Sequence, residues 1–351
     1  MDRISLRSRV IAAALVTLTS GALVLGGIAT PGAARPQALR AAVAERAAAD
    51  GALSVMSYNV EGLPAPARFS RAASLDEIGA RLAALRQLGR EPNVVLLQEA
   101  FSAPARRIAD EAGYPYVAQG PSASEVNDEP PPDAAAALVT QASHLKGEDD
   151  GKWVGSGLRI LSDYPIVRVD RLAFPQWACA GYDCLANKGA LIAWIKVPGS
   201  VHPVAFIDTH LNSRAASGVS KERADRAYEF QVEALRRFIA RAVPSEAVAF
   251  LGGDFNSGRA QDRQADLKPG LLPRSRNSLR DALAGAKAIL ASDEGDAHAI
   301  LQRAKDWLFY RGTAQLRVTL TGFDVPFGHE TDGSTLSDHM GYEAHYRVRV
   351  A

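Results

Sequence analysis

Acidic, amide and histidine side chains recur in this sequence at the ends of short apolar segments. Glu99 follows the apolar run of residues 93–98, and His210 and Asp254 stand at the ends of two later runs. Side chains at strand ends can converge on one rim of a sheet, where a rigid scaffold holds them. Carboxylate and amide oxygens bind hard cations such as Mg²⁺, and a histidine with a carboxylate behind it is a base near neutral pH. The pattern predicts a functional site at this rim, with ligands for a hard cation and a histidine base.

Each of these residues also has a purely structural interpretation. An Asn or Asp after a strand more often belongs to a turn than to a ligand set. His210 alone could be a histidine satisfied in the core, whereas a carboxylate next to a buried strand, such as Glu99, needs a partner. The collection of all these residues in one chain favours a functional site.

The elements that must position these side chains alternate between strands and helices. Residues 53–60 and 93–98 are apolar runs that predict buried strands, and apolar stripes predict helices over 75–88 and 221–241. Proline-rich residues 119–150 predict a surface insertion around a short helix. Further strands are expected at 157–161, 166–171, 189–196, 204–209, 247–252, 307–310, 315–321 and 342–350, and shorter helices at 278–284 and 296–305.

The composition is that of a folded protein. The 351 residues are 47% hydrophobic and 23% charged, and the chain is long enough for one large α/β domain or two small ones. The formal net charge of +1 gives no sign of a nucleic-acid coat or an acidic tail.

The N-terminus predicts export. Three arginines precede an apolar run over residues 10–28, and small residues follow at 32–34. This order is typical of a secretory signal peptide, here residues 1–34, although the long apolar run also leaves open an uncleaved membrane anchor. We expect a linker at 35–52, a catalytic domain at 53–351, and a secreted or periplasmic monomer.

The two cysteines of the chain, Cys179 and Cys184, lie close together in CAGYDC. In an oxidising compartment a disulfide is the favoured interpretation, and two free thiols are the alternative. A zinc site would need further soft ligands nearby.

The ordered set of polar motifs resembles the DNase-I-like endonuclease/exonuclease/phosphatase superfamily. The resemblance covers nearly all of residues 53–351 and implies an α/β (α+β) fold, a four-layer α/β/β/α sandwich with two β-sheets packed face to face. The matching segments are Ser57-Tyr58-Asn59-Val60, Gln98-Glu99-Ala100-Phe101, Asp208-Thr209-His210-Leu211, Gly253-Asp254-Phe255-Asn256, Lys305-Asp306-Trp307 and Ser337-Asp338-His339.

Within that superfamily the chain is most similar to the secreted bacterial neutral sphingomyelinases. Residues 179–189, CAGYDCLANKG, are similar to their C-x-x-x-D-x-L-x-N-K-G segment, and QEAF at 98–101 is similar to theirs. Two features depart from their pattern. Asn212 stands where they commonly have a glutamine, and the long aromatic run expected of a membrane-docking loop is missing between residues 254 and 339.

The resemblance implies a role for each site residue. Glu99 would be the main metal carboxylate, with Asn59 binding the metal or phosphate and Asp338 beside the metal cluster. His339 would be the general base, oriented by Asp306. Asp254 and Asn256 would position water and the phosphoryl oxygens, His210 would donate to phosphate or assist the leaving group, and Lys188 would contact phosphate.

The implied cofactor is Mg²⁺, with Mn²⁺ or Co²⁺ able to take its place, and the ligand types argue against zinc. Hydrolysis of sphingomyelin or another phospholipid at a membrane surface is the first interpretation, and a secreted DNase-I-like endonuclease acting on nucleic acid is the alternative. Two further hypotheses remain. The first is a phosphoesterase for small substrates, and the second is a non-enzymatic toxin or binding module on the same scaffold.

Overall fold

The computed structural model describes residues 50–351 apart from residues 66, 269 and 286–293. The predicted signal peptide and nearly all of the predicted linker lie outside the described residues. In the part of the chain that is described, no helix has the length and apolar character needed to cross a membrane.

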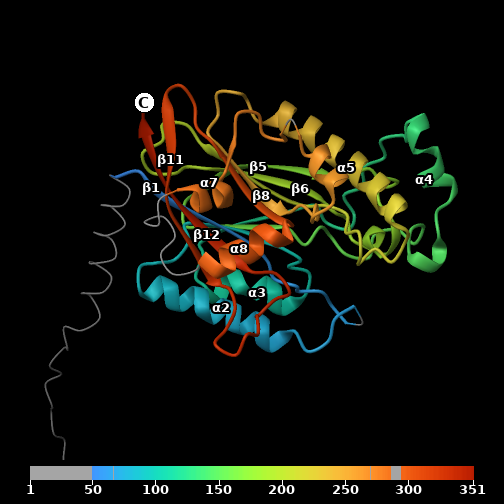
Figure 1. The fold of residues 1–351 in the computed structure, drawn as a ribbon, viewed down its shortest axis with the longest axis horizontal. Coiled ribbons are helices and arrows are strands. Elements are labelled where there is room, and N and C mark those ends of the chain that lie inside the picture. Colours follow the sequence, from blue (N-terminus) through green and yellow to red (C-terminus); the bar gives the residue numbers. More distant parts are fainter. Residues whose placement is uncertain (1–49, 66, 269, 286–293) are drawn as a thin grey trace, which may run out of the picture. The chain divides into compact units, whose positions relative to one another are not determined.

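Two six-stranded sheets form the centre of the described chain (Figure 1). The first has the order β11-β12-β1-β2-β4-β3 and the second the order β5-β6-β7-β8-β10-β9. The first sheet contains β1 (Ala52–Asn59), β2 (Val94–Gln98), β3 (Tyr116–Gln119), β4 (Arg159–Ser162), β11 (Leu316–Phe327) and β12 (Gly341–Val350). The second contains β5 (Ile166–Ala173), β6 (Gly189–Ile195), β7 (Val204–His210), β8 (Ala249–Asp254), β9 (Arg276–Asn277) and β10 (Asp306–Arg311).

Helices α2, α3 and α5 occupy the outer faces of the two sheets (Figure 1). Helices α2 and α3 pack on the first sheet through a core that includes Ile78 and Ile108, while α5 packs on the second sheet through Tyr228 and Leu235. The helices are α2 (Ala72–Gln87), α3 (Ala103–Glu111), α4 (Ala136–Thr140), α5 (Lys221–Ala242), α6 (Gln261–Asp266), α7 (Ser278–Ala284) and α8 (Glu294–Arg303). The fold is the predicted four-layer α/β/β/α sandwich.

Local sequence accounts for the helices that flank the functional strands. Ser102 caps α3 by accepting a hydrogen bond from the backbone of Ala105, and Ser220 caps α5 in the same way through Arg223. Buried residues recur along α5 from Ala224 to Ile239 at helical spacing, so one face of a long helix meets the sheet.

Strand alternation decides which side chains lie between the sheets. In β1, Val55 belongs to the core that includes the space between the sheets, whereas Met56 and Tyr58 belong to the core beneath α2 and α3. Because the period of a strand is two residues, Asn59 faces the other sheet with Val55. By the same alternation in β8, Asp254 lies on the same face of the strand as Phe250. Phe250 stacks on Phe206 of β7.

Nearly all predicted elements are confirmed, with small shifts at their ends. Strand β8 begins at Ala249 and runs to Asp254, and β11 continues to Phe327. Helix α3 and strand β3 were not predicted, because α3 is a short Arg-containing segment and β3 is a four-residue strand with only one buried residue. The insertion contains α4 and two short 3₁₀ turns, η1 (Asp133–Ala135) and η2 (His144–Lys146).

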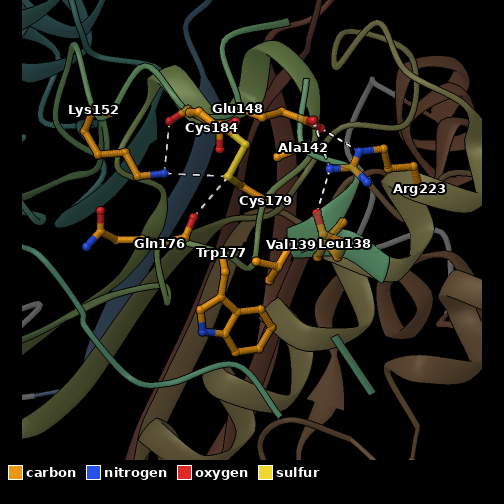
Figure 2. A pocket seen from close by; sticks show the side chains of 12 residues that line it. Leu138, Val139, Ala142, Glu148, Lys152, Gln176, Trp177, Cys179, Cys184 and Arg223 are labelled. Carbon is orange, nitrogen blue, oxygen red and sulfur yellow. Dashed lines mark hydrogen bonds and ion pairs between the residues drawn. A yellow bond between two sulfur atoms is a disulfide. The ribbon is translucent and has the colours of Figure 1, made fainter. Parts of the chain in front are cut away.

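The predicted disulfide between Cys179 and Cys184 is confirmed. It forms part of the wall of a cavity of about 310 Å³ between the insertion and α5, which Trp177 and Leu138 also line (Figure 2). The Lys152 ammonium donates to the carbonyl oxygen of Cys184 at 2.9 Å. The disulfide closes the short loop that leads into β6, and Lys152 joins this loop to the end of the insertion.

Reduction of this disulfide should lower the free energy of unfolding by about 2 kcal/mol, because the cross-link restricts a short loop in the unfolded chain. Guanidinium unfolding followed by circular dichroism, with and without a phosphine reductant, measures the change. A Cys179→Ser/Cys184→Ser variant should not respond to the reductant. A midpoint that does not move in the wild type would contradict the prediction.

Candidate active site

The ends of the central strands meet at one rim between the two sheets. Strands β1 and β2 run parallel with Asn59 beside Gln98, and β7 and β8 run parallel with His210 beside Asp254. Strand β10 begins antiparallel to the end of β8, which puts Asp306 next to Asp254. Residues far apart in the sequence therefore converge as the strand-end argument predicts.

Glu99 reaches this rim through an unusual backbone conformation. It follows the last residue of β2, where continued alternation would turn its side chain toward α2 and α3. Its φ of 57° is left-handed, which is uncommon for a residue other than glycine and ends the strand. The carboxylate instead lies beside Asn59, whose Nδ2 donates to Glu99 Oε1 at 3.0 Å.

Asn59 joins the two sheets at the rim. Its amide nitrogen also donates to Asp254 Oδ2 at 3.1 Å, across the space between β1 and β8. Its Oδ1 accepts from the backbone of Glu61, and the Ser337 hydroxyl donates to the Asn59 carbonyl at 2.7 Å. Asn59 is fully buried, so these bonds fix the amide orientation.

His339 and Asp306, predicted to be a general base and its orienting carboxylate, form a buried hydrogen-bonded pair. His339 Nδ1 donates to both Asp306 oxygens at 2.8 Å, which leaves Nε2 3.5 Å from Asp254 Oδ2. Burial opposes the charged imidazolium, but the two aspartates outweigh it and raise the pKa of His339 from 6.5 to about 9. In the metal-free protein His339 therefore carries a proton at neutral pH.

His210 has the opposite electrostatic character. Burial, and then the nearby Lys188 ammonium, hold the pKa of His210 well below its usual value, so the ring is neutral. Lys188 Nζ lies 3.1 Å from His210 Nε2 and pairs with Asp183 at 3.0 Å. The two histidines of the rim thus differ in protonation, as suits separate acid–base roles.

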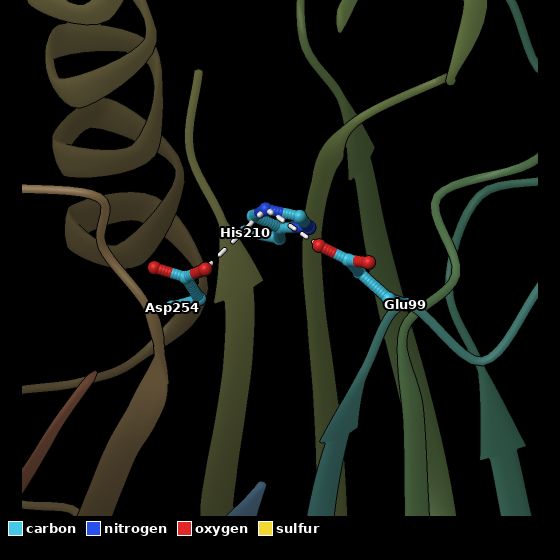
Figure 3. Close-up of side chains that lie close together, drawn as sticks. All are labelled: Glu99, His210 and Asp254. Carbon is cyan, nitrogen blue, oxygen red and sulfur yellow. Dashed lines mark ion pairs between the residues drawn. The ribbon is translucent and has the colours of Figure 1, made fainter. Parts of the chain in front are cut away.

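Among the described residues, two groups of three carboxylate or histidine side chains have ligand atoms close enough to share a cation. Glu99, His210 and Asp254 form one such group, drawn in Figure 3, and Asp254, Asp306 and His339 form the second. Burial raises the pKa of Glu99 to about 7 against the opposing effects of Asn59 and Lys188. A carboxylate in this state gains charge compensation from a cation, and the oxygen-rich set suits Mg²⁺ more than zinc.

The remaining predicted residues lie at the edge of this cluster. Asn256 follows β8 with a left-handed φ of 48°, and its backbone N–H donates to Asp254 Oδ1 at 2.9 Å. The Asp338 side chain is exposed, and among the described residues it belongs to neither group of close ligand atoms. Its backbone N–H donates to Glu61, so the loop before β12 is tied to the end of β1.

Sequence reasoning assigned no role to the polar residues that support the site from behind, although Gln98 and Asp208 stand in its motifs. Gln98 donates to the fully buried Asp208 at 2.7 Å, and burial raises the pKa of Asp208 well above its usual value. Asp183, which lies in the sphingomyelinase-like segment, and Glu61 were also given no role. Strand parity could have shown that Gln98 and Asp208 face each other between the sheets, whereas loop residues such as Glu61 give no comparable signal.

The rim is thus a buried cluster of carboxylates, an amide and two histidines at the strand ends of the sandwich. The sequence matches the profile of the Endonuclease/Exonuclease/phosphatase family over residues 56–339, and the chain belongs to this family. No curated protein sequence matches the chain.

Several solved structures share the fold at low sequence identity. Sphingomyelinase C from Streptomyces griseocarneus is 20% identical, with a TM-score of 0.51 over 84% of this chain and 99% of that one. Beta toxin from Staphylococcus aureus with bound magnesium ions is 18% identical, with a TM-score of 0.51 over 83% and 98%. TDP2 from D. rerio, complexed with a single-strand DNA product, is 17% identical, with a TM-score of 0.54 over 85% and 99%.

In metal-free protein, Asp306→Asn should lower the His339 pKa from about 9 toward 6.5, because it removes the nearest negative charge. The raised folded-state pKa stabilises the wild type most below pH 6.5, and this stabilisation disappears as the pH rises through 9. NMR titration of the imidazole resonances measures the shift, with His339→Asn used for assignment. An unchanged pKa in Asp306→Asn would contradict this electrostatic account.

Proposed function

We propose that the protein is a divalent-metal-dependent phosphodiesterase that cleaves its substrate by in-line attack of water. The observation that carries the proposal is the buried His339–Asp306 pair, whose free Nε2 points toward the carboxylates of the rim. A base held in this way next to a cation site is what phosphate-ester hydrolysis requires.

Glu99 would hold the cation, with Asp254 close by and Asp338 available from the loop before β12. Asn59 turns its amide nitrogen to Glu99 and Asp254 and its oxygen to Glu61, so its role would be to orient these two carboxylates. These residues fit a divalent cation because they offer carboxylate oxygens in a cluster that solvent can reach. The Glu99 side chain is 16% exposed, whereas the rest of the cluster is buried. When bound, Mg²⁺ would neutralise charge on the phosphoryl oxygens and offset the carboxylates that hold a proton on His339.

The chain's own residues divide the remaining work. His339 Nε2 accepts a proton from the attacking water while Asp306 keeps the ring oriented through Nδ1. Asp254 and Asn256 position the water and the phosphoryl oxygens. Lys188 places a positive charge beside His210 Nε2, so this pair stabilises a phosphoryl oxygen and assists the leaving group on the opposite side.

For the substrate, we propose a phospholipid with a phosphorylated head group, in the manner of a sphingomyelinase C. The sphingomyelinase-like segment at 179–189 supports this choice because it contains both the disulfide and Lys188. The described surface also exposes Leu145, Trp153 and Tyr182, whose side chains suit the interface of a bilayer. The fit of a disulfide with an oxidising compartment supports a secreted or periplasmic location.

A nuclease is the second candidate. The similar fold of TDP2, which is complexed with a single-strand DNA product, favours it. The net charge of +1 gives it no further support.

Metal-stripped protein with added Mg²⁺ should release phosphocholine from sphingomyelin vesicles, and Glu99→Gln should lower the rate by at least about 100-fold because it removes the main ligand charge. Supercoiled plasmid is assayed in parallel. The exposed Glu233→Gln on α5 is the matched control. Mg²⁺-dependent nicking of plasmid alone would move the substrate to nucleic acid, and full activity in Glu99→Gln would exclude the metal mechanism.

His339→Ala should reduce kcat by about 10²- to 10⁴-fold, because the general base is lost. Asp306→Asn should have a smaller effect, since the imidazole remains but loses the partner that orients Nδ1. Steady-state kinetics on the accepted substrate test both variants. The exposed His202→Ala serves as control, and an equal loss of kcat in that variant would contradict a specific role for His339.

A further inference from the structure

Arg263 on α6 is the largest fully buried side chain in the described part of the chain. An arginine does not lose its charge in a protein, so burial is tolerated only where the guanidinium has several partners. None of the sequence motifs includes this residue. We therefore infer the role of Arg263 from its hydrogen-bond partners.

One nitrogen of Arg263 bridges the two loops that leave the functional strands. Nη1 donates to the carbonyl oxygen of Asn212 at 2.7 Å and to that of Asn256 at 2.9 Å. Asn212 comes two residues after His210, and Asn256 comes two residues after Asp254. A single donor thus ties the end of β7 to the end of β8.

The other side of the guanidinium is fixed by α5. Nε donates to Asp225 at 2.6 Å, and the guanidinium carbon lies 4.3 Å from the centre of the Tyr228 ring. Asp225 also accepts from Arg214 at 2.8 Å, so its charge is shared between two arginines. The plane of Arg263 is therefore set by a rigid helix and not by the loops that it connects.

The loop after β8 needs such support because Asn256 is left-handed, with a φ of 48°. In this conformation its side-chain amide donates to the Leu211 carbonyl at 3.0 Å, and its backbone N–H donates to Asp254. Without the Arg263 bond the Asn256 carbonyl would lose its partner. The side-chain amide and the backbone N–H of Asn256 would then no longer be held in their orientation.

We propose that Arg263 is a positioning residue that fixes His210 and Asn256 relative to Asp254 without touching substrate. The proposal rests on the phosphodiesterase function proposed above. Small displacements of reacting groups cost up to about 100-fold in rate, so Arg263 should act on kcat.

Arg263→Met and Arg214→Met form a matched pair for the test. Both remove a partner of Asp225, but only Arg263 reaches the carbonyls of the two site loops. Arg263→Met should lower kcat by about 10- to 100-fold, with KM and the Mg²⁺ requirement within about 3-fold of wild type. Arg214→Met should keep kcat within about 3-fold of wild type.

Hydrogen exchange provides a readout independent of the reaction. Amides of residues 211–213 and 255–257 should exchange faster together in Arg263→Met and not in Arg214→Met. Arg263→Lys, which keeps the charge but not the two-sided geometry, should show the same kcat loss and replaces the Met variant if that fails to fold. Unchanged kcat and exchange in a folded Arg263 variant, or equal effects in Arg214→Met, would overturn the proposal. An inactive wild type with the expected exchange pattern would instead refute only the phosphodiesterase function.

Discussion

The site depends on one buried carboxylate, that of Asp254 at the end of β8. It accepts from Asn59 of the opposite sheet and from the backbone of Asn256, and it faces both rim histidines, His339 and His210. Burial opposes its ionisation, yet the charged His339 imidazolium and Lys305 hold the pKa of Asp254 below its usual value. A charge of this kind is tolerated only with its partners in place, so the rim forms as a unit.

The two sheets make this arrangement rigid. The parallel pairs β1–β2 and β7–β8 end at the same rim, and stacked aromatic side chains such as Phe206 and Phe250 fill the space behind it. Catalytic groups on strand ends are held by the backbone hydrogen bonds of a sheet, and the loops need only add Glu99, Asn256 and the residues before β12. Two of these, Glu99 and Asn256, are left-handed, so strain is concentrated where the strands stop.

Much of this could be predicted from the sequence, because it follows from local patterns. Short apolar runs predicted the strands, and polar residues at their ends predicted the rim. The pairing of His339 with Asp306 was implied by the family resemblance. The family profile confirms the resemblance drawn from the ordered motifs. Helix α3 was not predicted because its pattern is short, and the support from Arg263 was not predicted because it depends on loop paths that no local periodicity encodes. Asp338 remains a predicted ligand with an exposed side chain.

The central claim is that the rim binds a divalent cation at Glu99, next to Asn59 and Asp254. Anomalous diffraction from crystals soaked in Mn²⁺ tests it most directly, with Glu99→Gln crystals soaked in parallel. The account predicts an anomalous peak within coordination distance of the Glu99 carboxylate in the wild type and its loss in the variant. A wild-type peak elsewhere, or no peak at the rim under saturating Mn²⁺, would contradict it.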